Sequence, residues 1–280
     1  MEPAVQRRLA EILHTSDEGV RLAEAALWVA KVHYPDLDVN EYLRQLDQWG
    51  QAVRARLAEQ PSAEELVLAL NGFLFEELGF DGNLEAYYDP RNSYLNEVMD
   101  RRLGIPITLS VVYLDVGRSI GLPLEGVAFP GHFLVKFAVE QGEVVLDPFS
   151  HGVSLTEENL DELLGRLELE RPVPTPSLAE LLSTADARDV LARMLRNLKG
   201  IYLHQGDRQR ALAVTDLLVA VRPDQGRELR DRAALYQQLE CFAPALADYQ
   251  RYLDLVPEAE DAEDVRGRII DLQRCTRALH

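Results

Sequence analysis

Two side chains that can take part in proton transfer lie in the middle of the chain. His132 belongs to a Pro-Gly-His-Phe segment at 130–133, and Asp147 begins an Asp-Pro-Phe segment at 147–149. An imidazole can accept a proton near neutral pH, and a carboxylate bonded to the ring can orient it. A histidine that follows a Pro-Gly turn can equally be a hydrogen-bonded structural group, so the pair defines a candidate site rather than an activity.

The part of the chain that must position these residues is rich in turns. Glycines and prolines divide residues 79–169 into short elements, which is typical of an α+β domain. Residues 107–119 are predicted to form a helix, with Pro106 in its first turn and Gly121 at its C-terminal cap.

Strands are predicted to follow this helix. The segments rich in β-branched and aromatic residues are 127–129, 132–139 and 143–146. A hairpin turn at 141–142 would place Asp147 opposite Lys136. His132 would then lie four residues further along, about 13 Å away at ~3.3 Å per residue. A contact between His132 and Asp147 therefore requires a longer loop or a shifted register.

The N-terminal part of the chain, residues 1–78, is predicted to be helical. Its apolar residues recur at helical spacing, Asp38 can cap one helix, and Ser62 with Glu65 forms a capping box for another. No cluster of titratable side chains stands out there, so we interpret this part as packing for the 79–169 core.

A proline-rich segment at 170–176 marks a domain boundary. Prolines at alternate positions disfavour helix and central strand, and they favour an extended connector. Beyond it, Ser177 and Glu180 form a further capping box, and residues 177–280 are predicted to be a helical domain.

The helical tail contains an internal repeat. Three residue pairs recur with a separation of 34 residues: Tyr202 and Tyr236, Ala211 and Ala245, Pro223 and Pro257. This is the spacing of tetratricopeptide repeats. Lys199 and Thr215 depart from the usual small and large residues, and the helix at 262–279 is predicted to cap the end. Two repeats can hold a peptide or serve only for structural docking, and the sequence favours neither.

The segments at 92–98, 102–110, 130–133 and 146–149, together with these repeats, resemble SirB-type proteins, which join a transglutaminase-like core to a tetratricopeptide tail. In transglutaminase-like enzymes a Cys at a helix N-terminus is the nucleophile, a His on the following strand is its base, and an Asp on the next strand orients the His. The resemblance implies these last two roles for His132 and Asp147. It places the Cys position on Pro106, which has no nucleophilic atom.

Two hydroxyls near Pro106 are the remaining candidate nucleophiles. Thr108 and Ser110 follow on the same predicted helix, and Ser110 is one turn beyond Pro106 and so shares its face. A hydroxyl is a poor substitute for a thiol, because it must be deprotonated by a well-placed base during attack. A serine in a helix more often bonds to its own backbone.

Other polar residues surround the same region. Asn92, Asn96, Arg102 and Gly131, with Pro106, are candidates to line a pocket, although buried asparagines more often hold a loop by bonding its backbone. His151 lies near Asp147 but brings no ligand spacing, so we expect no metal ion and no cofactor.

Composition limits the classes of partner. The chain has 280 residues and a formal net charge of −18, and it lacks the basic run that nucleic-acid binding requires. Its two cysteines predict no disulfide framework, and no apolar stretch is long enough to span a membrane. We expect a cytoplasmic protein that binds neither nucleic acid nor membrane.

Two functions remain. The first is a non-catalytic module for protein interaction or regulation, in which the repeats dock a protein or peptide, and Pro106 favours it. The second is an acyl-transfer or hydrolase enzyme that uses Ser110 or Thr108 with His132 and Asp147. We favour the first, and a hydrogen bond between either hydroxyl and the imidazole ring would favour the second.

Overall fold

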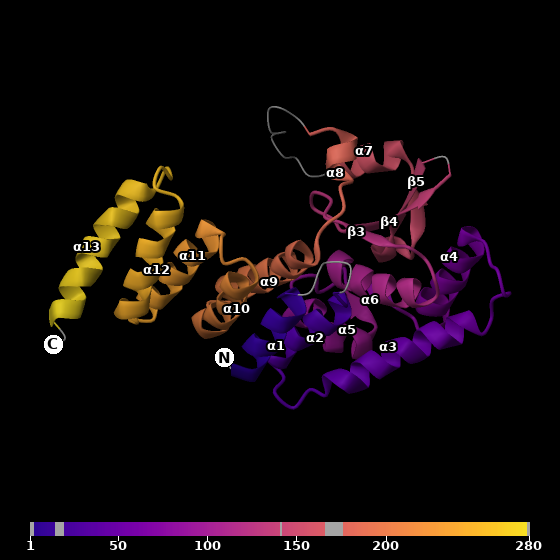
Figure 1. Cartoon of the computed structure of the whole chain (residues 1–280), viewed down its shortest axis with the longest axis horizontal. Helices are drawn as coiled ribbons and strands as arrows, with labels where there is room; N and C mark the ends of the chain where they lie inside the picture. Colours follow the sequence, from indigo (N-terminus) through magenta and orange to yellow (C-terminus); the bar gives the residue numbers. More distant parts are fainter. Residues whose placement is uncertain (1–2, 15–19, 141, 166–175, 279–280) are drawn as a thin grey trace. The chain divides into compact units, whose positions relative to one another are not determined.

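The computed structural model describes residues 3–14, 20–140, 142–165 and 176–278, which belong to two compact units (Figure 1). The core unit is Ile12–Met194, and the repeat unit is Met1–Glu11 with Leu195–His280. The connector expected at 170–176 lies outside the described residues except for Pro176. The α+β fold class is confirmed, because the chain combines many helices with a small antiparallel sheet.

The core unit contains a four-stranded antiparallel sheet in the order β3-β4-β5-β6. Its strands are β3 (Glu125–Val127), β4 (Leu134–Val139), β5 (Gly142–Asp147) and β6 (Val153–Leu155). Strand β4 begins two residues later than predicted, because Gly131 (φ 65°) and the bond from the His132 amide to the Phe129 carbonyl (3.1 Å) form a turn. Strand β6 was not predicted from the sequence.

Helices cover both faces of this sheet. Leucines of α7 (Glu157–Gly165) and α8 (Leu178–Leu181) pack on one face around Val127, Leu134 and Val145. Helix α6 (Pro106–Ser119) packs on the other face against β3 and β4, so the sheet lies between α6 and α7 (Figure 1).

The remaining helices of the core unit surround α6. They are α2 (Leu22–Lys31), α3 (Val39–Arg54), α4 (Ala63–Asn71), a π-helix (Gly72–Glu77) and α5 (Leu95–Arg101). The expected caps are confirmed: the Asp38 carboxylate accepts from two amides at the start of α3, and Ser62 forms a capping box with Glu65 at the start of α4.

Helix α6 is buried on every side of its first turns. All residues from 106 to 114 are buried, which marks a central helix rather than an amphipathic surface helix. Pro106 is its first residue, and Gly121 (φ 104°) follows its end, as predicted. Strand β2 (Leu103–Gly104) lies just before α6 and forms a short parallel pair with β1 (Asp81–Gly82).

The repeat unit contains the expected helix pairs. Its helices are most of α1 (Pro3–His14), the second part of α9 (Ala187–His204), α10 (Arg208–Val221), α11 (Gly226–Gln238), α12 (Phe242–Leu255) and α13 (Ala262–Ala278). Tyr202, Ala211 and Ala245 are buried, as the tetratricopeptide pattern requires. Val265 and Leu272 of α13 pack into the same cluster as residues of α11 and α12, so α13 covers an apolar face of the second repeat.

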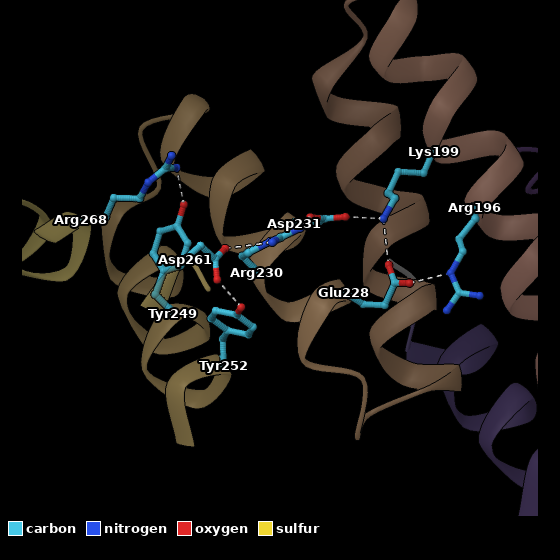
Figure 2. Close-up of polar contacts among 9 residues, drawn as sticks. All are labelled: Arg196, Lys199, Glu228, Arg230, Asp231, Tyr249, Tyr252, Asp261 and Arg268. Atoms are coloured by element: carbon cyan, nitrogen blue, oxygen red, sulfur yellow. Dashed lines mark hydrogen bonds and ion pairs between the residues drawn. The ribbon is translucent and has the colours of Figure 1, made fainter. Parts of the chain in front are cut away.

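Lys199 stands where the repeat pattern usually has a small residue, and its ammonium group makes ion pairs. Its Nζ donates to Glu228 Oε2 (2.8 Å) and to Asp231 Oδ2 (2.7 Å), and Arg196 Nε donates to Glu228 Oε1 (2.7 Å) (Figure 2). Glu228 is only 1% exposed. Burial alone would favour its neutral form, but the bonds from Lys199 and Arg196 outweigh this and lower the pKa of Glu228. The ion pairs therefore join α9 to α11.

Removing Glu228 should destabilise the repeat unit. In Glu228→Ala the buried Lys199 ammonium loses one of its two carboxylates, and we expect a loss of about 3 kcal/mol in the free energy of unfolding, measured by urea denaturation. The control is Asp271→Ala, which removes an exposed pair with Arg274 and should cost less than about 0.5 kcal/mol. Equal losses in the two variants would contradict this role.

Candidate functional site

The imidazole of His132 and the carboxylate of Asp147 are in direct contact. Nε2 of the ring lies 2.8 Å from Oδ1, and the two side chains are 13% and 4% exposed. Oδ1 also accepts from the amide of Phe149 (3.0 Å), and Oδ2 accepts from the hydroxyl of Ser150 (2.7 Å). The ring of Phe149 meets the imidazole edge to face at 5.8 Å. We call His132 and Asp147 the dyad.

Electrostatics favours an ionised carboxylate in the dyad. Burial alone would raise the pKa of Asp147, but hydrogen bonds from His132, Ser150 and the Phe149 amide outweigh it and hold this pKa below its usual value. Because an ionised carboxylate only accepts hydrogen bonds, Nε2 is the ring nitrogen that carries the proton. In the neutral ring Nδ1 then has a free lone pair, through which an imidazole acts as a base.

The register of the hairpin differs from the sequence prediction. Val139 pairs with Gly142, and Lys136 faces Val145 instead of Asp147. The register is thus displaced by two residues from that of a turn at 141–142. In this register Asp147 is level with Leu134, two residues from His132 instead of four, so the displacement shortens the separation expected from the sequence.

The turn after Asp147 is anchored to two helices. The hydroxyl of Tyr113 in α6 donates to Asn71 Oδ1 (2.8 Å), and Asn71 Nδ2 donates to the carbonyl of Gly152 (3.1 Å). The amide of Gly152 in turn donates to the carbonyl of Asp147 (2.8 Å). A Cβ atom at Gly152 would lie 2.2 Å from Asn71 Oδ1, so this close approach requires glycine.

Sequence reasoning did not identify Asn71, Tyr113 or Ser150 as parts of the site. A serine three residues after an Asp-Pro pair is a recognisable turn pattern, and it could have indicated Ser150. Asn71 and Tyr113 gave no such pattern, because their bonds join residues 42 and 81 positions apart.

The hydroxyls of Thr108 and Ser110 both bond to the main chain. Ser110 Oγ donates to the carbonyl of Phe133 (3.3 Å), and Thr108 Oγ1 donates to the carbonyl of Asn92 (2.8 Å). Both residues are 0% exposed. Among the described residues, no hydrogen bond joins either hydroxyl to the ring of His132.

The other candidate pocket residues have distinct surroundings. Asn92 is fully buried, and Gly131 provides the positive φ of the turn before His132. Asn96 is buried in α5, and its Oδ1 has no hydrogen-bond partner in the described part of the chain. The guanidinium of Arg102 lies over the ring of Trp49 at 4.7 Å, and burial lowers the pKa of Arg102. None of the three side chains, Asn92, Asn96 or Arg102, has a hydrogen bond to the dyad.

His151 does not join the dyad. Its Nε2 lies 3.1 Å from Asp81 Oδ1. Within the described ranges, no group of three or more His, Cys, Asp and Glu side chains is arranged to hold a metal ion. Within the same ranges, no helix is both long and apolar enough to cross a bilayer.

Comparison with known proteins matches both parts of the chain. The sequence pattern of the transglutaminase-like superfamily covers residues 40–196, and that of the tetratricopeptide repeat covers residues 198–269. A UPF0162 protein of Xylella fastidiosa is 42% identical over 91% of both chains. Protein SirB1 of Salmonella typhimurium is 28% identical over 94% of both chains. F-box only protein 21 of Homo sapiens is 34% identical over 61% of this chain and 28% of its own.

The dyad should affect how the free energy of unfolding depends on pH. Because the folded-state pKa of Asp147 is lowered, its ionised form contributes stability that is complete above the unfolded pKa of about 3.9. This stability is lost as the pH falls through the folded-state pKa. Between about pH 6 and about pH 3, urea denaturation should show a smaller loss for Asp147→Asn than for the wild type. Asp271→Asn is the exposed control, and a wild-type profile in Asp147→Asn would argue against the ionised pair.

Proposed function

The chain belongs to the transglutaminase-like superfamily, and we propose that it is a non-catalytic member that acts by binding other proteins. One observation carries the proposal. Pro106 is the first residue of α6, at the position to which the sequence resemblance assigns the cysteine of related enzymes. The nearby hydroxyls of Thr108 and Ser110 are buried and donate to main-chain carbonyls. An alcohol attacks only when a base removes its proton, and within the described residues no hydrogen bond joins either hydroxyl to a side chain that could act as a base.

The repeat unit supports a binding role. Tetratricopeptide repeats generally mediate protein interaction, and the sequence pattern covers residues 198–269. A cavity of about 300 Å³ lies among α11, α12 and α13. Its lining carries both signs of charge, with Arg230 bonded to Asp261 (2.9 Å) and Arg268 bonded to the Tyr249 hydroxyl (3.1 Å) (Figure 2). We take this cavity as the place where a protein or peptide contacts the repeats.

The dyad supports a second candidate, an acyl-transfer or hydrolase activity. His132 is held by an ionised carboxylate through Nε2, and its Nδ1 has no hydrogen bond to a described residue. This arrangement is that of a general base. The nucleophile would have to be Ser110 or Thr108, released from its present bond to the main chain.

Covalent labelling separates the two functions. A serine-directed electrophile such as a fluorophosphonate should label neither Ser110 nor Thr108. Mass spectrometry should therefore find no adduct at these residues in either the wild type or His132→Ala. Ser110→Ala is the site control. A label on either hydroxyl that disappears in His132→Ala would overturn the non-catalytic proposal.

A cysteine at position 106 tests whether Pro106 occupies the place of the missing nucleophile. In a background without Cys241 and Cys275, the thiol of Pro106→Cys should react with iodoacetamide with an apparent pKa below about 8.5. The helix N-terminus and the imidazole both favour the thiolate, so adding His132→Ala should raise this value. Ile107→Cys, one residue further along α6, is the control. An unchanged pH profile after His132→Ala would contradict the assignment.

A further inference from the structure

The two edges of the four-stranded sheet differ. The edge at β3 is covered, because Val127 forms an antiparallel bridge with Thr184 and the amide of Ala185 donates to the carbonyl of Gly126 (2.8 Å). Strand β6, at the other edge, pairs with β5 alone. Among the described residues, no main-chain hydrogen bond joins residues 153–155 to any further segment. An edge strand of this kind keeps N–H and C=O groups that can pair with another strand. We call residues 153–155 the open edge.

The open edge also presents an apolar side chain to solvent. Val153 is 50% exposed, and Leu155 packs beside the cluster under α7. Because side chains alternate along a strand, these two residues lie on the same face and Ser154 lies on the other. An apolar side chain on a strand added beside β6 would therefore cover Val153 through a cross-strand contact.

Contacts just before β6 fix the position of the open edge. His151 has a left-handed backbone (φ 59°), and its ring lies 5.2 Å from the ring of Phe75. Gly152 is bonded through its carbonyl to Asn71 and through its amide to Asp147. A strand that is already held in place loses little conformational entropy when a partner binds.

Exposed carboxylates lie at both ends of the open edge. Asp81 is 62% exposed, and its Oδ1 lies 3.1 Å from Nε2 of His151, two residues before β6. Glu157 and Glu158 are exposed in the first turn of α7, directly after β6. In the part of the chain that the structure describes, none of these three carboxylates forms an ion pair with a Lys or Arg. They can therefore pair with the cations of a partner.

The charge of the chain is concentrated on the core unit. Residues 12–194 contain 14 Lys and Arg against 31 Asp and Glu, a net charge of −17, so the core unit holds nearly all of the −18 of the chain. Such a surface attracts a basic partner and repels a second copy of the same chain. Charge complementarity therefore selects a basic occupant for the open edge.

We propose that an extended segment of a partner protein, rich in Lys and Arg, adds to the sheet as a strand beside β6. Main-chain bonds to the open edge provide affinity in this mode of binding, and side chains provide selectivity. Basic side chains of the segment pair with Asp81, Glu157 and Glu158, and an apolar one covers Val153. The inference rests on the proposed function only in treating the chain as a binding protein, and it places a binding surface on the core unit.

Peptide selection tests the proposal. A phage library of random 12-residue peptides is selected on the full chain and counter-selected on Glu157→Gln/Glu158→Gln. Enriched peptides should contain basic residues and alternate apolar with polar ones. In fluorescence polarisation they should bind this double variant about tenfold more weakly than the wild type, and salt should weaken their binding to the wild type.

A matched control removes the same charge elsewhere in the core unit. Asp36 and Glu41 are exposed carboxylates at the start of α3 and just before it. Asp36→Asn/Glu41→Gln should keep wild-type affinity for the peptides, and circular dichroism should confirm that both double variants are folded.

N-methylation of the peptides separates strand addition from attraction between charges alone. Alternate residues of an added strand bond to the edge, so methylating the amides that face β6 should weaken binding at least about tenfold. Methylating the intervening amides should leave binding unchanged, although the peptide charge is the same. Hydrogen exchange of the amides at 153–155 should slow when the unmethylated peptide is bound.

Four outcomes would overturn the proposal. They are a selection without enrichment, wild-type affinity for Glu157→Gln/Glu158→Gln, binding that tolerates N-methylation at every position, and self-association that slows exchange at 153–155 without peptide. Peptides that leave this exchange unchanged and are lost on Arg230→Ala would bind the repeat unit, which rejects the open edge and leaves the proposed function intact. Failure of the proposed function itself would appear separately, as labelling that depends on His132.

Discussion

The contact between His132 and Asp147 depends on the pairing of β4 with β5. With Val135 opposite Leu146, β5 ends beside the turn at Gly131, and the imidazole reaches the carboxylate at 2.8 Å. The turn that follows then satisfies both carboxylate oxygens through the Phe149 amide and the Ser150 hydroxyl. Because a buried carboxylate is costly without such partners, the hairpin and the turn stabilise the dyad together.

The burial of the first turns of α6 explains why the hydroxyls of Thr108 and Ser110 bond to main-chain carbonyls. A helix enclosed on all sides leaves no water for its polar side chains, so Thr108 and Ser110 must find partners within the protein. Main-chain carbonyls of Asn92 and Phe133 are those partners. The same requirement gives Thr108 a structural role, because its bond to the carbonyl of Asn92 joins α6 to a segment 16 residues earlier in the chain.

Charged side chains join the helices of the repeat unit, and one of them, Lys199, stands where tetratricopeptide repeats usually have a small residue. Arg196 and Arg230 stand 34 positions apart, and each bonds a carboxylate later in the same unit. Arg196 bonds Glu228 of α11, and Arg230 bonds Asp261, which directly precedes α13. Figure 2 shows these contacts along the repeats. Two repeats bury a limited apolar core, so the ion pairs between α9 and α11 and the packing of α13 supply further stabilisation.

Local patterns in the sequence were sufficient for the helical elements, the 34-residue repeat and the caps at Asp38 and Ser62, because each involves residues close together along the chain or a fixed period. They also indicated the dyad residues through resemblance to a known family. The tertiary structure alone decided the strand register, the partners of Thr108 and Ser110, and the anchoring by Asn71. These contacts join distant parts of the chain, and their geometry follows from how whole elements pack, which no local spacing determines.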